Sequence, residues 1–342
     1  MNEWKNKRVL ITGANGFIGG ALTERLTSLG AEVFAFYHTV DLNKALFGSP
    51  VLNSRPLGFR VENTIIGDLR DPADCREAVS VSAPEVVFHL GAITQVTEAR
   101  MRWSDVMMVN AVGTLNLLEA LQNVDSKAAI ICASSDKAYG HGDTKSAFTN
   151  DARLDRAVHP YDVSKACGDL AARAFAETHG MNLQVTRLAN VYGPGDTNWK
   201  RLIPGVIRWI LENRQIDIRS DGKHVRMYLY IDDAVDAYLR IAERMTEWGV
   251  ITKPLGWNIA PDDARSVTDV LDMLEDIFKD RGVHIPEVKI WEKAKDEGTC
   301  LFLDDTVTRA YFGWKPEVHF RFGLENTIDW IMDYLALREA MK

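Results

Sequence analysis

The sequence predicts an α/β fold, a doubly wound parallel sheet with a smaller mixed α/β domain. Three observations predict it: the chain has 342 residues, short apolar runs alternate with helical patterns over its first half, and the alternation loosens after residue 188. Strands that alternate with helices are typical of parallel sheets covered by helices on both faces. The length exceeds that of one domain of usual size, about 100–200 residues, and favours two domains.

The predicted elements follow one another closely at the start of the chain. An apolar run at residues 9–11 is followed by helical periodicity over residues 17–29 and by a second apolar run at residues 33–36. These patterns predict a βαβ unit. Further buried strands are predicted at residues 64–66, 86–90, 129–133 and 183–187, and helices between them at residues 71–80, 106–121 and 164–179.

The second half of the chain mixes short strands with helices. Helices are predicted at residues 231–245, 266–279 and 322–334. We assign residues 1–188, with an interleaved stretch at about 225–260, to the first domain. Residues 189–224 and 261–342 are assigned to the second domain.

The composition limits the partners of the chain. Hydrophobic residues make up 46% and charged residues 26% of the sequence, as in ordinary globular proteins, and the formal net charge is −8. An acidic chain has no general attraction for nucleic acid or an anionic membrane surface. We therefore expect no nucleic-acid and no membrane partner, and we expect local groups to hold any anionic ligand.

The cysteines and the N-terminal residues predict the compartment. The four cysteines, at positions 75, 132, 167 and 300, are widely spaced and show no metal-ligand spacing, so we expect reduced cysteines and no metal. The polar residues 1–8 lead directly into a predicted strand. No run reaches the roughly 18 apolar residues of a membrane helix. These observations predict a soluble, cytoplasmic protein.

A glycine-rich turn, Gly13-Ala14-Asn15-Gly16-Phe17-Ile18-Gly19, connects the first predicted strand with the first predicted helix. Its glycines permit a tight turn, close approach of the backbone to a pyrophosphate, and close packing of the helix on the strand. The amide groups and the positive dipole at the helix N-terminus can then bind phosphate. A turn that serves packing alone is the alternative. The candidate cofactor-binding residues here are Gly13, Asn15, Gly16, Phe17, Ile18 and Gly19.

The spacing G-x-x-G-x-x-G resembles that of the extended branch of the short-chain dehydrogenase/reductase family, with its Rossmann-type fold and nucleotide-sugar substrates. Residues 67–71 are similar to the family loop that contacts adenine, which implies roles for Asp68 and Leu69; an N-cap of the next helix is the alternative for Asp68. Residues 89–92 resemble the strand end that lies along the cofactor, which implies Leu90 and Ala92. His89 could equally be a core histidine.

The position that usually binds the adenosine ribose departs from the family pattern. A carboxylate is usual about 20 residues after the turn, but the second predicted strand ends Phe36-Tyr37-His38, and Asp41 comes a few positions late. No arginine stands there for the 2′-phosphate of NADP. We therefore expect NAD as the cofactor.

Tyr161 and Lys165 are four residues apart, which places both side chains on one face of a helix. The lysine ammonium, together with a positive nicotinamide ring, is expected to lower the pKa of the tyrosine from about 10 toward the working range. Ser135 follows an upstream strand and is expected to bind the same substrate oxygen. These three residues match the catalytic triad of the family, which implies that Tyr161 and Lys165 also contact the cofactor.

Asp136 and Lys137 directly follow the predicted catalytic serine. A pair at this point resembles the nucleotide-sugar 4,6-dehydratases, and the Asp-Lys version is similar to the CDP-glucose 4,6-dehydratases. The resemblance implies transient oxidation at C4 with NAD, elimination of water across C5 and C6, and return of hydride to C6. Asp136 is the candidate acid, and Lys137 stands where related enzymes place the base. A solvated charge pair is the alternative.

Other functions share part of this pattern. A nucleotide-sugar 4-epimerase or decarboxylase would use the turn and the Tyr161–Lys165 pair without needing Asp136. An ordinary alcohol dehydrogenase would release NADH. A non-catalytic NAD-binding sensor protein would need the turn alone.

The expected substrate is a nucleotide-diphosphate hexose. Arg201 and Arg226 carry guanidinium groups, whose geometry matches phosphate oxygens, and the resemblance implies Asn190 and Leu202 as further substrate contacts. An exposed strand arginine is the alternative for Arg226. Helices 106–121 and 164–179 carry enough apolar residues for a second apolar face. The resemblance implies that they form a four-helix interface in a homodimer.

Overall fold

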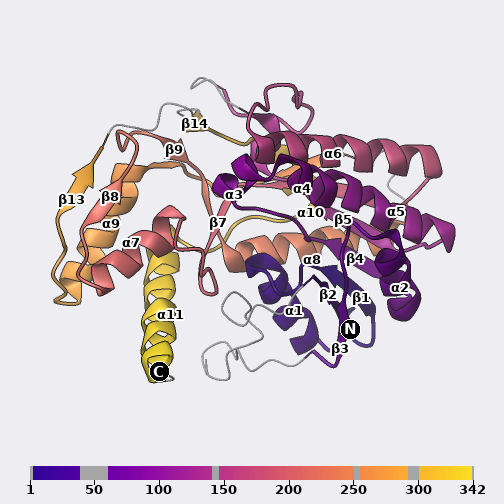
Figure 1. Ribbon diagram of the computed structural model, residues 1–342, viewed down its shortest axis with the longest axis horizontal. Helices are drawn as coiled ribbons and strands as arrows, with labels where there is room; N and C mark the ends of the chain where they lie inside the picture. Colours follow the sequence, from indigo (N-terminus) through magenta and orange to yellow (C-terminus); the bar gives the residue numbers. More distant parts are fainter. Residues whose placement is uncertain (1–2, 39–60, 141–145, 250–254, 292–299, 341–342) are drawn as a thin grey trace.

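The computed structural model describes residues 3–38, 61–140, 146–249, 255–291 and 300–340 (Figure 1). Its centre is a seven-stranded sheet in the order β11-β6-β5-β4-β1-β2-β3, in which every strand pair is parallel. The predicted α/β fold class is confirmed. The strands of this sheet are β1 (Arg8–Thr12), β2 (Glu32–Tyr37), β3 (Asn63–Ile66), β4 (Val86–His89), β5 (Ala129–Ala133), β6 (Leu183–Leu188) and β11 (Gly256–Ile259).

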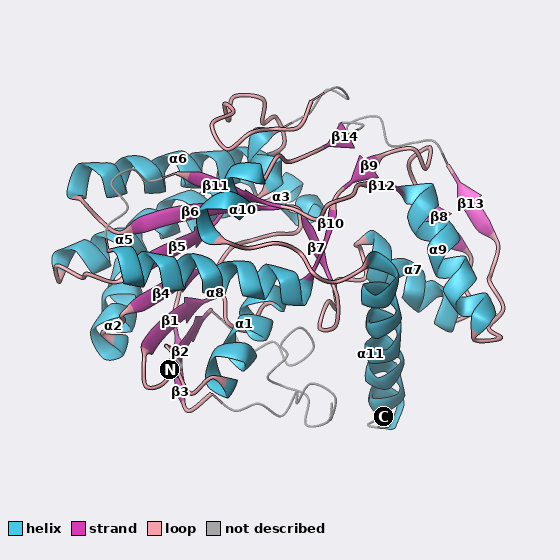
Figure 2. Ribbon diagram, turned by 180° about the vertical axis from the view of Figure 1, so that it is seen from behind, coloured by secondary structure: helices cyan, strands magenta, loops and turns pink. Residues whose placement is uncertain are grey.

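Helices cover both faces of the sheet (Figures 1 and 2). Val9 and Ile11 of β1 belong to the apolar core under α1 and α8, whereas Leu10 points to the core under α2, α5 and α6. The strand order reverses between β1 and β4, and ligands of such sheets bind beside the reversal at the carboxyl ends of the strands. The covering helices are α1 (Phe17–Ser28), α8 (Ile231–Trp248), α2 (Pro72–Ser82), α5 (Gly113–Asn123) and α6 (Pro160–His179).

β3 differs from the buried strand that the sequence predicts. It lies at the edge of the sheet beside β2, its burial alternates, and Ile66 is 64% exposed. A short apolar run does not distinguish an edge strand from a central one, because periodicity over four residues is too short to decide.

The helix predicted over residues 106–121 is interrupted by a π-helical turn. α4 (Trp103–Met107) runs into η2 (Met108–Val112) before α5 continues. In this turn the Asn110 side chain bonds the carbonyl and amide of Ile93 at 3.0 and 2.8 Å and the hydroxyl of Ser164 at 2.9 Å. A π turn is frequent at functional sites, and this one ties the helix to α6.

Residues 202–226 and 265–290, together with the helix over residues 320–340, form a second group of elements beside the sheet (Figure 1). The sequence predicts neither α7 nor α10; Pro204 lies in the first turn of α7, where a helix tolerates proline. Among the described helices, none is both long enough and apolar enough to cross a membrane. The remaining elements are α3 (Val96–Met101), η3 (Asp136–Tyr139), β7 (Asn190–Tyr192), α7 (Leu202–Leu211), β8 (Ile216–Ile218), β9 (Val225–Arg226), β10 (Tyr228–Tyr230), β12 (Arg265–Ser266), α9 (Val267–Asp280), β13 (Val288–Ile290), β14 (Cys300–Leu301), α10 (Thr306–Phe312) and α11 (Phe320–Ala340).

Candidate active site

The glycine-rich turn between β1 and α1 forms a cradle that larger residues would fill. Gly13 has a φ of 68°, and a Cβ there would lie 2.8 Å from the Cα of Gly91. A Cβ at Gly19 would lie 2.2 Å from the carbonyl oxygen of Gly13. Gly16 is the N-cap of α1, and the first turn holds no acidic residue, so its amides and dipole suit phosphate. These residues fit NAD. The same turn carries Asn15, Phe17 and Ile18.

A directional chain of hydrogen bonds fixes the strand ends beneath this turn. Gly91 N donates to Thr12 Oγ1 at 2.9 Å, Thr12 Oγ1 lies 2.8 Å from His89 Nδ1, and His89 Nε2 lies 2.9 Å from Thr114 Oγ1. Thr114 gives its own proton to the Asn110 carbonyl at 2.8 Å. It therefore accepts from Nε2–H, while Nδ1 accepts from Thr12. Burial lowers the pKa of His89 to about 3, so His89 is a neutral core histidine.

Asp68 lies in the loop after β3 among charged neighbours. Arg70 Nη2 lies 2.5 Å from Asp68 Oδ2, and His38 Nε2 lies 3.3 Å from the same oxygen. The hydrogen bond from Arg70 lowers the pKa of Asp68. The N-cap of α2 is Asp71, whose side chain accepts from Ala73 N at 2.8 Å. The N-cap alternative for Asp68 is therefore wrong, and the adenine contact stays a prediction.

The other predicted cofactor contacts lie around the same strand ends. Leu69 is buried, and its Cδ1 would be 2.7 Å from a Cβ on Gly91. Leu90 and Ala92 flank this glycine directly after β4. His38 follows β2, where the ribose carboxylate is usual; Asp41 lies outside the described residues.

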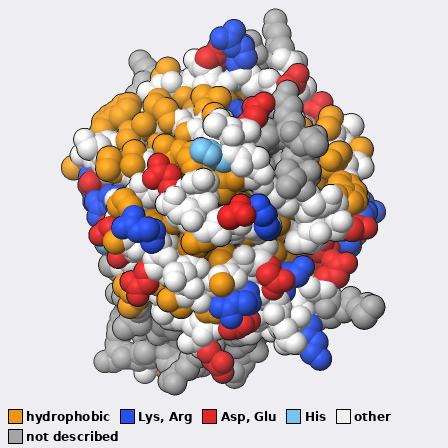
Figure 3. All heavy atoms as spheres, turned by 90° about the vertical axis from the view of Figure 1, so that its right-hand side faces the viewer, with side chains coloured by type: hydrophobic (Ala, Val, Ile, Leu, Met, Phe, Trp, Pro, Cys, Tyr) orange, Lys and Arg blue, Asp and Glu red, His pale blue; other side chains and the backbone are white. Residues whose placement is uncertain are grey.

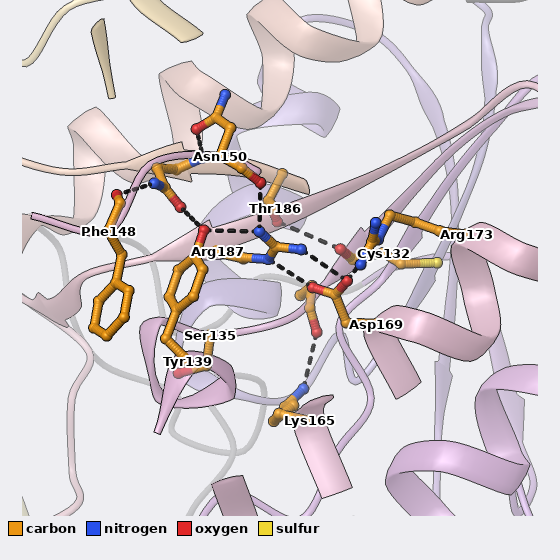
Figure 4. Close-up of polar contacts among 12 residues, drawn as sticks. Cys132, Ser135, Tyr139, Phe148, Asn150, Lys165, Asp169, Arg173, Thr186 and Arg187 are labelled. Carbon is orange, nitrogen blue, oxygen red and sulfur yellow. Dashed lines mark hydrogen bonds and ion pairs between the residues drawn. The ribbon is translucent and has the colours of Figure 1, made fainter. Parts of the chain in front are cut away.

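Ser135, Tyr161 and Lys165 meet near the carboxyl end of β5. Lys165 Nζ donates to the Ala133 carbonyl at 2.9 Å (Figure 4), and burial lowers the pKa of Lys165 to about 8. Burial raises the pKa of Tyr161 to about 12, and its hydrogen bond with Ser135 and the charge of Arg201 oppose this rise. The protein alone therefore does not give the predicted lowering of the tyrosine pKa, because burial outweighs the neighbouring charges. The positive nicotinamide ring is the remaining expected contribution.

Asp136 is buried, with 4% of its surface exposed, and begins the 3₁₀ turn η3. Ser135 caps this turn: its Oγ donates to Asp136 Oδ1 at 2.9 Å and accepts from Lys137 N at 3.2 Å. Burial raises the pKa of Asp136, against the charge of Lys137 and the bond from Ser135. A buried carboxyl with a raised pKa can hold a proton and donate it. The solvated-pair alternative is therefore wrong for Asp136, whereas Lys137 is half-buried.

Arg226 lies on β9, and its positive charge opposes the rise in the pKa of Asp136. It is buried, with 8% of its surface exposed, so the alternative of an exposed strand arginine is wrong. Asn190, predicted as a substrate contact, begins β7, and its backbone N–H donates to the Met227 carbonyl at 3.1 Å.

Arg201 is the N-cap residue of α7, directly before Leu202. Its Nη1 bonds the buried carboxylate of Asp196 at 2.9 Å, and its guanidinium lies 5.8 Å from the ring centroid of Phe17. Burial raises the pKa of Asp196, and Arg201 opposes the rise. Arg201 therefore connects α7, in the second half of the chain, with the first turn of α1.

The sequence analysis missed a buried polar network that contacts both η3, which carries Asp136, and α6, which carries Tyr161 and Lys165 (Figure 4). Arg187 of β6 is 1% exposed and pairs with Asp169 of α6. It also donates to the hydroxyl of Tyr139, in the turn that carries Asp136. One signal in the sequence was available, an arginine within a strand predicted to be buried, since a buried charge needs a partner.

Residues 9–252 match the NAD dependent epimerase/dehydratase family. The chain belongs to this family. It is 29% identical to CDP-glucose 4,6-dehydratase of Salmonella typhimurium, over 97% of this chain and 91% of the relative. It is 28% identical to UDP-N-acetyl-alpha-D-glucosaminuronate decarboxylase of Bacillus cytotoxicus, over 96% of this chain and 98% of the relative. The structure of MoeE5 in complex with UDP-glucose and NAD is 25% identical and has a TM-score of 0.79, covering 96% of this chain and 99% of that chain.

Membership in the epimerase/dehydratase family confirms the resemblance drawn from the sequence and the choice of NAD as cofactor. The protein is an NAD-dependent enzyme. Within the part of the chain that the structure describes, no group of three or more His, Cys, Asp and Glu side chains is placed to hold a metal ion.

Proposed function

We propose that the protein is a nucleotide-sugar 4,6-dehydratase that converts CDP-glucose to CDP-4-keto-6-deoxyglucose. One observation carries the proposal: the buried Asp136, with its raised pKa, is hydrogen-bonded to Ser135 beside the Tyr161–Lys165 pair. An enzyme that only oxidises and reduces C4 needs no buried acid at this place. The 29% identity to a CDP-glucose 4,6-dehydratase over 97% of the chain supports the choice of nucleotide.

The proposed reaction assigns one proton transfer to each side chain. NAD, when bound, would supply the hydride acceptor for C4 and the hydride donor for C6. Tyr161 takes the proton of the O4 hydroxyl, and Ser135 binds the same oxygen. Lys137, acting as a neutral amine, then removes the proton of C5, Asp136 gives its proton to the C6 hydroxyl, the C6–O bond breaks, and water leaves. A proton returns to C5 when C6 is reduced, so the net change is the loss of one water.

The diphosphate of the substrate would lie between the two arginines. Arg226 and Arg201 offer guanidinium groups to phosphate oxygens, with Asn190 and Leu202 beside them. The charge of Arg226 acts on Asp136, so the reacting sugar and the bound phosphate would lie close together. We assign residues 1–188, with about 225–260, to an NAD-binding domain and residues 189–224 and 261–342 to a nucleotide-sugar-binding domain.

A decarboxylase or 4-epimerase is the second candidate, since the chain covers 98% of a decarboxylase relative at 28% identity. The same Tyr161–Lys165 pair would serve it. Its product would differ: an epimerase leaves the mass unchanged, and a decarboxylase releases carbon dioxide.

We further propose a cytosolic homodimer formed by the helices η2, α5 and α6. Met108 and Val112 of η2 and Leu170 of α6 are apolar and 41%, 36% and 50% exposed. Figure 3 views the end of the molecule where α5 and α6 end, and apolar side chains gather in its upper left part. The four cysteines are unpaired, which fits a reducing compartment. Light scattering after gel filtration would give twice the chain mass, and Leu170→Glu would give the monomer.

The test of the activity uses the purified protein with NAD and, separately, CDP-, dTDP-, UDP- and GDP-glucose. Mass spectrometry is expected to show the loss of one water from the CDP-sugar. An unchanged mass with a changed sugar configuration by NMR would instead establish the epimerase, and water loss from another nucleotide would overturn the choice of CDP.

A further inference from the structure

A buried ion pair links the two segments that carry the proposed chemistry. We infer that Arg187 is a positioning residue, which fixes the turn of Asp136 against the helix of Tyr161 so that elimination follows oxidation on the same bound sugar. The inference rests on the proposed 4,6-dehydratase function, because it concerns the passage from one step to the next.

The first contact of Arg187 is with α6. Its Nε and Nη2 atoms bond the two carboxylate oxygens of Asp169 at 2.8 and 3.0 Å, a two-point geometry that fixes orientation as well as distance (Figure 4). Asp169 lies one helical turn after Lys165 and two turns after Tyr161. Arg173 holds the same carboxylate at 2.7 Å. The guanidinium therefore fixes the position of α6, the helix that carries Tyr161 and Lys165.

The second contact is with η3. Arg187 Nη1 donates to the Tyr139 hydroxyl at 2.7 Å, and this hydroxyl also lies 2.7 Å from Asn258 Oδ1. The ring of Tyr139 stacks on Phe148 at 4.6 Å between centroids. Tyr139 ends the short turn that Asp136 begins, so fixing the ring fixes the backbone of the proposed acid and base.

The surroundings of the guanidinium leave it little freedom to move. Its Nη1 also donates to the Asn150 carbonyl at 2.8 Å, and a Cβ at Gly256 would lie 2.2 Å from its Cζ. Arg187 is 1% exposed. A buried charge with this many bonds has one favourable position, because every alternative leaves a polar group without a partner.

The two steps need this spacing for a chemical reason. Oxidation requires Tyr161 at O4 of the sugar, and elimination requires Asp136 at O6 while the sugar stays in place. A misplacement of about 1 Å in such an arrangement can cost about 100-fold in rate. Loosening Tyr139 should therefore slow elimination and leave oxidation nearly intact.

The mildest test is Tyr139→Phe, which keeps the stacked ring and removes only the hydroxyl. Arg187→Lys keeps the charge but loses the two-point bond to Asp169. Tyr192→Phe is the matched control, since it removes one buried hydroxyl from β7 whose bond at 3.2 Å goes to the Phe320 carbonyl. Melting temperatures are measured for every variant, and rates are measured well below the lowest of them.

Two assays separate the steps. The first follows loss of water from the nucleotide-glucose that the wild type dehydrates. The second follows NADH absorbance with the matching nucleotide 6-deoxyglucose, which can be oxidised at C4 but has no C6 hydroxyl to lose. We expect Tyr139→Phe to lose about tenfold to 100-fold in the first assay and less than about threefold in the second, and Arg187→Lys, which also loses the bond to α6, to lose rate in both assays. Tyr192→Phe should change neither by more than about threefold.

The outcomes are distinct. A wild type that removes no water from any nucleotide-glucose would sink the proposed function itself. A wild type that dehydrates, with Tyr139→Phe slowed equally in both assays or in neither, would sink the inference about Arg187 and leave the function standing.

Discussion

The hydroxyl of Ser135 donates to Asp136 Oδ1 at 2.9 Å and also bonds Tyr161. One small side chain thus contacts the proposed base for O4 and the proposed acid for O6. Tyr161 and Asp136, which must act in sequence, therefore share Ser135 as a hydrogen-bond partner. A substitution at one of them is expected to affect the other through this serine.

Asp136→Asn should stop elimination while oxidation continues. The amide oxygen can still accept from Ser135, but the side chain has no acidic proton to give. We expect water loss to fall about 10²- to 10⁴-fold, the usual contribution of a general acid. Rapid mixing with the nucleotide-glucose should still produce NADH absorbance. Dehydration by this variant at the wild-type rate would remove Asp136 from the mechanism.

Lys137→Met and Lys137→Arg should separate a base from a fixed charge. The charge of Lys137 opposes the rise in the pKa of Asp136, so its loss raises that pKa further. The acid then stays protonated to higher pH, and the alkaline limb of the residual elimination rate should move upward in Lys137→Met but stay in place in Lys137→Arg. Both variants should lose exchange of the C5 proton, measured in D₂O. Methionine has no basic nitrogen, and the guanidinium of arginine is not deprotonated in proteins. Normal exchange in Lys137→Arg would assign Lys137 the role of a charge only.

Gly19→Ala should weaken NAD binding. Its Cβ would lie 2.2 Å from the Gly13 carbonyl oxygen, so the turn must shift away from the position that its amides need for the pyrophosphate. We expect the dissociation constant for NAD, measured by calorimetry, to rise about 100-fold. Gly282→Ala is the control: its φ is 70° and its Cβ would meet open space, so it should cost about 1 kcal/mol of stability and leave NAD affinity unchanged. Equal affinity in both variants would contradict the role of the turn.

His89→Gln should change how stability depends on pH. Burial lowers the folded-state pKa of His89 to about 3 from the usual value of 6.5. The unfolded chain therefore binds the proton first, and stability is lost as pH falls from 6.5 toward 3, by about 1.4 kcal/mol per pH unit for this group. In urea unfolding, the free energy of unfolding of the variant should fall less steeply over this pH range. At pH 7.5 it should be lower than that of the wild type by about 1–3 kcal/mol, because the hydrogen bonds of residue 89 are altered. An identical slope in both proteins would exclude His89 as the source.

The regular elements were largely predictable, because each carries its own periodicity. The strand predicted at 183–187 is observed as Leu183–Leu188, and the helix predicted at 266–279 as Val267–Asp280. The edge position of β3 was not predictable, since burial depends on neighbours far away in the sequence. The π turn around Asn110 was missed because it preserves the apolar pattern of an ordinary helix while changing its hydrogen bonds.

The candidate site also has some features that could be predicted from the sequence and others that could not. Ser135, Tyr161 and Lys165 could be named because they match the catalytic triad of the family and because Tyr161 and Lys165 are four residues apart, on one face of a helix. Burial of Asp136 and Arg226 could not, because exposure is set by the fold as a whole. The bonds of Arg187 join positions 139, 150 and 169, and no local pattern in one sequence records contacts of that range. The assignments of individual residues to cofactor and substrate stay predictions.

The place of β11 at the sheet edge has a consequence for synthesis on the ribosome. β6 pairs with β11 on its outer side, and Gln184 bonds Leu255 N at 3.1 Å and Trp257 Nε1 at 2.7 Å. Until residues 256–259 leave the exit tunnel, the nascent chain presents β6 as an open edge, and such edges pair with strands of other chains. We therefore expect this edge to be open to pairing with other chains while residues 189–259 are being synthesised.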